Sequence, residues 1–181
     1  MLNQQQRQML LALARRAIAA AFDGKRLEVD GDDLDEDLRR LAGTFVTLHE
    51  GQRELRGCIG SVEAYEPLYR SVVSNAVNAA FRDPRFSPLT PAELPEVQLE
   101  ISVLTPFQKV ENVEEIVPGR DGLLVRRGRS AGLLLPQVAS EYGWDRETFL
   151  SQTCIKAGLP PSSWRDPQTR IERFSAEVFG E

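Results

Sequence analysis

The sequence predicts an α+β fold in which helices flank an antiparallel or mixed sheet. Patterns typical of helices and of strands are interspersed along the chain, which would also fit a parallel α/β fold. However, β-rich segments joined by turn-rich loops occur twice, within residues 44–62 and 123–135, and such hairpins require antiparallel pairs. Residues 97–104 add a further strand pattern, with apolar side chains at every second position. We therefore expect α+β and not a doubly wound parallel sheet.

Length and composition are those of a single domain over residues 1–181, or of two small lobes that share a core. The chain has 181 residues, of which 41% are hydrophobic and 27% charged. A chain of this length buries about 70% of its unfolded surface and needs no disulfide or metal to fold. Its formal charge of −5 argues against general nucleic-acid binding, because that affinity comes mainly from Lys and Arg. A local basic patch stays open.

One histidine and two cysteines limit the chemistry that the side chains can provide. His49, Cys58 and Cys154 lie too far apart in the sequence to form a structural zinc site or an iron–sulfur cluster. A Ser-His-Asp enzyme would have to use His49. We therefore expect no metal and no cofactor.

The N-terminal 22 residues predict an amphipathic helix packed on the body of the protein. Arg7, Arg15 and Arg16 interrupt the apolar stretch, and the apolar residues follow one helix face, unlike those of a signal peptide. No other segment could span a bilayer. Two unclustered cysteines without an export signal favour free thiols in a reducing compartment. We expect a cytoplasmic protein with no membrane partner.

The acidic run at residues 30–38 predicts a solvated loop that leads into a short helix. A calcium loop starting at Asp30 would need Gly and Glu at its sixth and twelfth positions, where this chain has Asp35 and Leu41. Asp side chains are instead favourable near the positive end of a helix.

The middle of the chain predicts a hairpin followed by a buried helix. Strands at residues 44–49 and 55–62 flank a five-residue loop that contains Gly51. Pro67 then occupies a first helical position, and apolar residues cover most of that helix up to Arg82. Its remaining stripe is polar but uncharged and consists of Ser71, Ser74, Asn75 and Asn78.

The second half of the chain predicts one more hairpin, two helices and a closing strand. Four prolines between residues 84 and 95 indicate a semi-rigid loop before the strand at 97–104. The further elements are a hairpin with apolar runs at 123–125 and 133–135, a short helix from Pro136 to Tyr142, a helix from Asp145 to Gly158 and a strand at 170–179.

Residues 55–60, with the sequence LRGCIG, are unlike an ordinary strand and are called the hexapeptide below. Two glycines in an apolar strand mark a bulge or a place where a backbone or ligand comes close. Strand alternation would place Arg56, Cys58 and Gly60 on one face. A guanidinium beside a thiol favours the reactive thiolate, so Cys58 and Arg56 are candidate catalytic residues. The alternative is that Cys58 only fills space, as buried free cysteines usually do.

Four further residues are candidates for ligand binding. Gly57 and Gly60 would allow a ligand to approach the strand closely. Asn75 belongs to the uncharged polar stripe of the helix, and Arg85 follows Asp83-Pro84 in a loop that could present it to a site.

Other polar residues have weaker reasons for a role. His49 lies across the hairpin from Cys58 and could act as its base, although a histidine next to loop residues is typically solvated. Cys154 lies near the C-terminal end of a helix, where the dipole disfavours a thiolate, so we expect it to pack. The turn that holds Arg126, Arg127 and Arg129 could grip an anion or simply keep a hairpin tip soluble.

Several segments together resemble the AMMECR domain family, and more closely its bacterial and archaeal branch, AmmeMemoRadiSam system protein A. They are FVTL at 45–48, LRGCIG at 55–60, NAAFRDPRF at 78–86, ELPEVQLEISVLTP at 93–106, PGRDGLLV at 118–125, GLLLPQVA at 132–139 and FLSQTCIKAGLP at 149–160. The resemblance covers the chain from about residue 10 to its end, and LRGCIG is the signature of the family.

This resemblance implies more about fold and context than about chemistry. It implies a compact α+β protein with a larger and a smaller lobe and with the hexapeptide between packed elements. It also implies a three-component system with a Memo-like protein, related to extradiol dioxygenases, and a radical SAM protein. It assigns no reaction, no substrate and no catalytic role to any residue of the hexapeptide.

Three hypotheses about function follow. The first is an enzyme or enzyme subunit that acts on a small molecule or a modified macromolecule, with Cys58 as nucleophile or thiolate ligand and Arg56 orienting an anion. The second is a non-catalytic scaffold that docks the Memo-like and radical SAM partners, in which the hexapeptide is only a tightly packed strand. The third, a nucleic-acid modification factor, requires a concentrated basic face.

Overall fold

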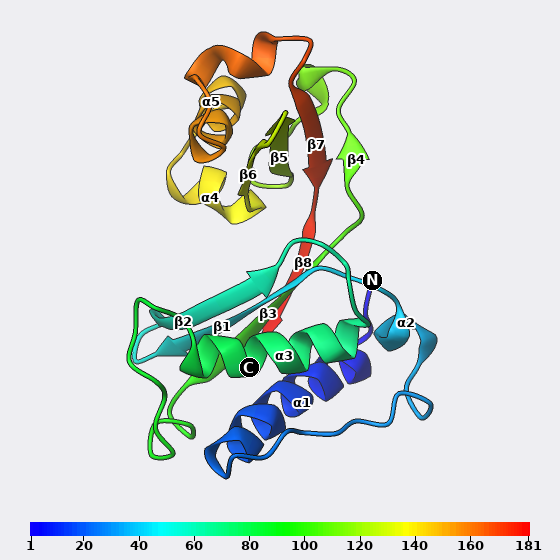
Figure 1. Cartoon of the computed structure of the whole chain (residues 1–181), viewed down its shortest axis with the longest axis vertical. Helices are drawn as coiled ribbons and strands as arrows, with labels where there is room; N and C mark the ends of the chain where they lie inside the picture. Colours follow the sequence, from blue (N-terminus) through cyan, green and yellow to red (C-terminus); the bar gives the residue numbers. More distant parts are fainter. The chain divides into compact units, whose positions relative to one another are not determined.

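The computed structural model describes all 181 residues, which divide into two compact units (Figure 1). The first unit contains Met1–Leu104 and Glu177–Glu181, and the second contains Thr105–Ala176. Each unit has its own antiparallel sheet and its own helices, so the predicted α+β class is confirmed. None of the helices combines the length and the hydrophobicity that a membrane span requires.

The first unit packs two long helices on one face of a four-stranded sheet (Figure 1). Its elements are α1 (Gln4–Phe22), α2 (Glu36–Arg39), β1 (Thr44–Glu50), β2 (Glu54–Ser61), α3 (Leu68–Phe81), β3 (Gln98–Leu104) and β8 (Ala176–Gly180). The strand order is β2-β1-β3-β8, so β2, which carries the hexapeptide, is an edge strand. The core between helices and sheet includes Leu10, Ile18, Val46, Leu48, Val72 and Ile101.

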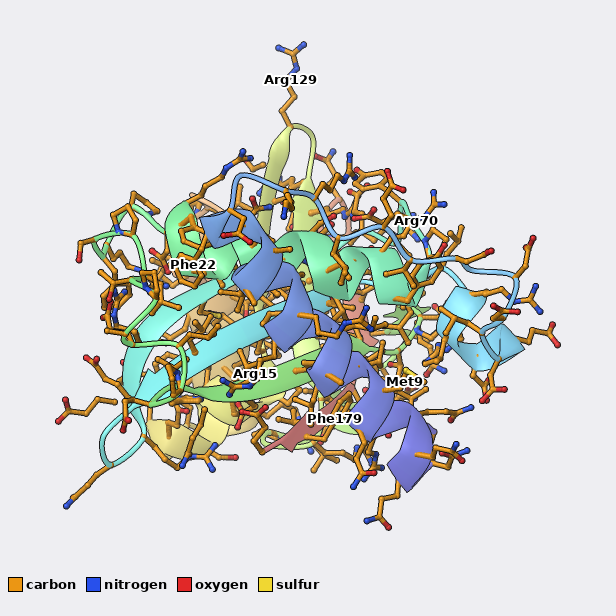
Figure 2. The ribbon with its side chains drawn as sticks, turned by 90° about the horizontal axis from the view of Figure 1, so that it is seen from below. Met9, Arg15, Phe22, Arg70, Arg129 and Phe179 are labelled. Carbon is orange, nitrogen blue, oxygen red and sulfur yellow. The ribbon has the colours of Figure 1, made fainter.

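Helix α1 forms where the sequence predicts it. Asn3 caps the helix and accepts a hydrogen bond from the backbone of Gln6, whose side chain bonds back to the backbone of Asn3. Arg15 projects from α1 toward the sheet edge, as Figure 2 shows. Its guanidinium donates to the backbone oxygens of Leu94 and Val97 at 2.6 and 2.8 Å and pairs with Glu181. The helix thus ties together the segment before β3 and the end of the chain.

At Gly57, helix α3 approaches β2 more closely than a side chain at that position of the strand would allow. A Cβ atom on Gly57 would lie 2.3 Å from the backbone oxygen of Ala79. Nearer the start of α3, the Thr44 and Ser71 hydroxyls lie 2.8 Å apart, and Asn75 Nδ2 lies 2.9 Å from Thr44 Oγ1. All three polar side chains are buried and satisfy one another, so Ser71 and Asn75 of the polar stripe face β1 and serve packing.

Residues 82–97 form the loop between α3 and β3, called the proline-rich loop below, and β2 holds this loop through Arg56. The Arg56 side chain is only 7% exposed, and its Nε donates to Glu93 Oε1 at 2.9 Å. Its Nη1 donates to Ser87 O at 3.1 Å. Hydrogen bonds from Arg56 and then from Thr90 lower the pKa of Glu93 from 4.5 to about 2.

The second unit also packs its helices on a small sheet. Its elements are β4 (Gln108–Lys109), a 3₁₀ turn (Val113–Glu115), β5 (Gly122–Arg127), β6 (Ser130–Leu134), α4 (Pro136–Glu141), α5 (Arg146–Lys156), a second 3₁₀ turn (Pro161–Arg165) and β7 (Arg170–Phe174). The strand order is β4-β7-β5-β6. Asp145 caps α5 by accepting a hydrogen bond from the backbone of Thr148, as its position predicts.

One predicted strand was wrong. Residues 170–179 form two strands in two different sheets, β7 in the second unit and β8 in the first. The chain leaves the ladder at Ser175, whose backbone exchanges hydrogen bonds with Thr105: Ser175 N donates to Thr105 Oγ1, and Thr105 N donates to Ser175 O. The side-chain alternation continues through this point, so the pattern alone could not locate the break.

The first testable prediction concerns the contact between β2 and α3. Gly57→Ala should lower the free energy of unfolding by about 1–3 kcal/mol, because the new methyl group meets backbone that cannot rotate away. Leu55→Ala, on the same strand but 39% exposed, should change it by less than about 0.5 kcal/mol. Urea unfolding of both variants measures the difference, and a Gly57→Ala protein as stable as wild type would contradict this reading.

A second prediction concerns the pH dependence of the Arg56–Glu93 pair. Because folding depresses the pKa of Glu93, its ionised carboxylate stabilises the folded protein. This contribution to the free energy of unfolding should be complete above pH 4.5 and should disappear as the pH falls toward 2. Glu93→Gln should therefore cost about 1 kcal/mol at neutral pH, after allowance for the partial exposure of Glu93. Urea unfolding should show the two proteins converging below pH 4.5, with the exposed Glu96→Gln as control. A difference that stays constant from pH 7 to pH 2 would refute the assignment.

Candidate functional site

A β-bulge interrupts the hexapeptide at Arg56. His49 pairs with Leu55, but the next residue of β1, Leu48, pairs with Gly57, so Arg56 is the extra residue. The uninterrupted alternation expected along the hexapeptide is therefore wrong. After the bulge, Gly57 lies against α3, while Cys58 pairs with Thr47.

The bulge and the proline-rich loop give Arg56 a different environment from the one predicted. Its guanidinium donates to Glu93 and Ser87, and Glu50 Oε2 lies 3.9 Å from its Nε. The expected pairing of Arg56 with the Cys58 thiol is not observed. Arg56 thus holds the loop against β2.

Cys58 is a half-buried free cysteine whose sulfur has a polar neighbour. The Thr47 hydroxyl on β1 donates to Cys58 Sγ at 3.2 Å. This contact follows from the register of the bulged hairpin, which places the two residues directly opposite each other. Cys58 is therefore neither fully buried nor fully exposed, and its sulfur has a polar partner.

Asp83 and Arg85 bind the backbone of Cys58 on the outer edge of the sheet. Cys58 N donates to Asp83 Oδ2 at 2.9 Å, and Arg85 Nη2 lies 3.4 Å from Cys58 O. These two side chains take the place of a neighbouring strand, which covers an edge that would otherwise be open. The predicted loop that presents Arg85 thus reaches the hexapeptide.

The Asp83–Arg85 pair is tightly bonded but leaves part of Arg85 exposed. Arg85 Nη2 donates to Asp83 Oδ2 at 2.7 Å, and its Nε donates to Oδ1 at 3.0 Å. The Arg85 guanidinium holds the pKa of the buried Asp83 carboxyl well below its usual range. The pKa of Arg85 is raised, mainly by these bonds and to a smaller extent by charge interaction with Cys58. The Arg85 side chain is 55% exposed, so a solute can still reach its guanidinium.

The structure places the other predicted binding residues in packing contacts. Gly57 lies against Ala79, and a Cβ on Gly60 would lie 2.3 Å from the Phe45 ring. Asn75 is buried in the polar network with Thr44. In this structure both glycines make room for protein atoms.

His49 and Cys154 each have their own surroundings. His49 Nδ1 lies 3.2 Å from Arg53 O and its Nε2 3.8 Å from Glu100 Oε1, toward β3, and its side chain is only 16% exposed. It is therefore mostly covered, unlike the solvated histidine expected at a loop. Cys154 packs fully buried in the second unit, as predicted, and burial raises the pKa of its thiol.

The predicted basic cluster on the β5–β6 hairpin is largely compensated by carboxylates. Arg127 pairs with Asp166 at 3.1 Å, and Arg126 lies 3.7 Å from Glu172. Arg129 extends from the hairpin tip into solvent (Figure 2). The cluster therefore presents one projecting arginine, which fits the reading of a soluble hairpin tip.

Sequence reasoning missed Thr47, Asp83 and Glu93 as neighbours of the hexapeptide. The contact between Thr47 and Cys58 depends on the bulge, which shifts the pairing of β1 and β2 by one residue. Asp83 carries a signal that could have been used, because an Asp two residues before an Arg can bond both that side chain and a nearby backbone N–H. Glu93 lies far from Arg56 in the sequence, and no local pattern joins them. No group of three or more His, Cys, Asp or Glu side chains could hold a metal ion.

Known proteins resemble this chain over almost its whole length. The AMMECR1 family model matches residues 11–179. Protein TK0174 of Thermococcus kodakarensis is 47% identical over 96% of this chain and 89% of its own length. A protein of Methanothermobacter thermautotrophicus is 46% identical over 99% of this chain and 96% of its own. The crystal structure of the uncharacterized protein PH0010 from Pyrococcus horikoshii matches with a TM-score of 0.85 and 43% identity, over 96% of this chain and 90% of that one. The chain therefore belongs to the AMMECR1 family.

Proposed function

We propose that Cys58 is the reacting group of a cytoplasmic thiol-dependent enzyme or enzyme subunit, and that Arg85 orients an anionic substrate beside it. The observation that carries this proposal is the convergence of Thr47, Asp83 and Arg85 on one half-buried cysteine. Thr47 bonds the sulfur, while Asp83 and Arg85 bond the backbone of the same residue. A thiol that is held in place on a partly exposed residue is suited to react with a substrate that diffuses in.

Arg85 takes the role that the sequence suggested for Arg56. A buried arginine that already binds a carboxylate and a backbone oxygen has little capacity left for a substrate, and Arg56 is such a residue. Arg85 is more than half exposed, and a guanidinium has five N–H donors, of which the internal bonds use only part. A carboxylate or phosphate is the group that an exposed guanidinium binds most favourably.

We further propose that the protein works with a Memo-like protein and a radical SAM protein. This context rests on the resemblance of the chain to its branch of the family. The low number of catalytic side chains supports such a division of labour, because one histidine and two cysteines offer few groups for a complete reaction.

The alternative, a scaffold that docks those partners, is favoured by a different observation. Arg56, Gly57 and Gly60 all make contacts that serve packing. On this view Cys58 contributes packing, and its loss affects stability more than any reaction.

The third prediction tests the charge beside the thiol. Iodoacetate, which carries a carboxylate, and neutral iodoacetamide both alkylate thiols. Arg85→Gln should lower the ratio of their rates at Cys58 roughly fivefold, the equivalent of about 1 kcal/mol for a partly exposed charge pair. Arg129→Gln removes an equal charge at the β5–β6 hairpin tip and should leave the ratio unchanged.

Mass spectrometry of the modified peptide separates Cys58 from Cys154. Equal ratios in wild type and Arg85→Gln would contradict a role for Arg85 in orienting anions.

The fourth prediction separates the reactive thiol from the scaffold. Cys58→Ser keeps the size of the side chain, and we expect it to retain the thermal stability of the wild type within about 1 kcal/mol and its binding to both partners. It should nevertheless abolish the function of the reconstituted three-component system. Cys154→Ser serves as the control for loss of a thiol. Full system function with Cys58→Ser would favour the scaffold.

A further inference from the structure

An extended segment lies beside the helices of the first unit. Residues 24–30 follow α1 and form no helix or strand. The Gln6 side chain near the start of α1 donates to Asp35 Oδ2 at 3.2 Å, so the chain returns along the whole helix between Phe22 and Asp35. Gln6 and Phe22 lie about 24 Å apart at 1.5 Å per helical residue. Since residues 31–34 form a turn, residues 24–30, called the return segment below, cover most of this distance (Figure 1).

The return segment has the burial pattern of a strand without a strand partner. Leu27 and Val29 pack against the core, while Arg26, Glu28 and Asp30 are exposed. Residues 26–29 neither donate nor accept any backbone hydrogen bond within the protein. An extended backbone with free N–H and C=O groups is a template for another strand.

A groove lies between this segment and α3. Its volume is about 430 Å³, and its walls are residues 26–29 on one side and Tyr69, Arg70, Val73 and Ser74 on the other. Leu27, Val29 and Val73 supply apolar surface to the groove, and Tyr69 and Ser74 supply hydroxyl groups. An open strand edge facing a helix across a groove is the geometry in which extended peptides add to a protein by β-augmentation.

The charges of the groove indicate which peptide fits. Arg26 makes no ion pair, and Arg70 bonds only Tyr69, through its Nε at 2.9 Å and over the ring. The groove also contains Glu28, so its net charge is positive in a chain whose total charge is −5.

We propose that this groove binds an extended acidic peptide of a partner protein, which pairs with residues 26–29 as a β-strand and presents a carboxylate to Arg26 and Arg70. Its alternate apolar side chains fill the surface formed by Leu27, Val29 and Val73. The groove does not include Cys58 or its neighbours, so this docking function is independent of the proposed thiol chemistry.

Selection of a phage-displayed random peptide library on the full chain tests the proposal. We expect the selected peptides to alternate apolar and polar residues and to carry Asp or Glu. A synthetic selected peptide should bind at least tenfold more weakly to Glu28→Pro, which lacks one strand N–H, and to Arg70→Glu. Glu28→Ala keeps the N–H, and Arg39→Glu reverses the charge of an exposed arginine on α2. Both controls should bind within about threefold of wild type, and thermal unfolding confirms that all four variants are folded.

Amide hydrogen exchange gives the second readout. The backbone N–H groups of residues 26–29 should exchange fast in the free protein and at least tenfold more slowly when the peptide is bound. Peptides that bind Glu28→Pro as well as Glu28→Ala would overturn the proposal. It would also fail if binding left these amides unprotected and were displaced by inorganic phosphate, because the groove would then be a site for small anions.

Discussion

The close contact between β2 and α3 at Gly57 determines where the rest of the candidate site lies. Because no Cβ separates the strand from Ala79 near the end of α3, the loop that follows the helix starts beside the hexapeptide. Asp83, two residues after α3, is thereby placed to accept the backbone N–H of Cys58. The same glycine that reads as a possible ligand contact in the sequence thus brings together two parts of the chain that form the site.

Local signals predicted most elements of the fold. Helix α5 begins after Asp145 and ends before Gly158, and both residues act through hydrogen bonds or dihedral angles that do not depend on distant contacts. The division of residues 170–179 between two sheets was not predictable, because alternation continues through Ser175. Strand β4, with two residues, is too short to carry a periodic pattern.

The candidate site was predictable only in part. Cys58 and Arg85 stood out in the sequence, but their neighbours depend on the bulge at Arg56. A regular ladder that pairs His49 with Leu55 would pair Thr47 with Gly57, whereas the bulge pairs Thr47 with Cys58. A long-range carboxylate binds Arg56 and draws its side chain away from the thiol. The sequence therefore indicated Cys58 and two candidate arginines, of which Arg85 contacts Cys58 in the structure and Arg56 does not.

The proposed chemistry requires that the Cys58 sulfur react in the folded protein. The rate of its alkylation by iodoacetamide as a function of urea concentration tests this requirement most directly, with the buried Cys154 as the internal reference. If the site is reactive in the native state, the Cys58 rate stays constant below the unfolding transition, while the Cys154 rate rises with urea as unfolding exposes it. If both cysteines remain unmodified until the protein unfolds and then react together, Cys58 is a packing residue and the account is wrong.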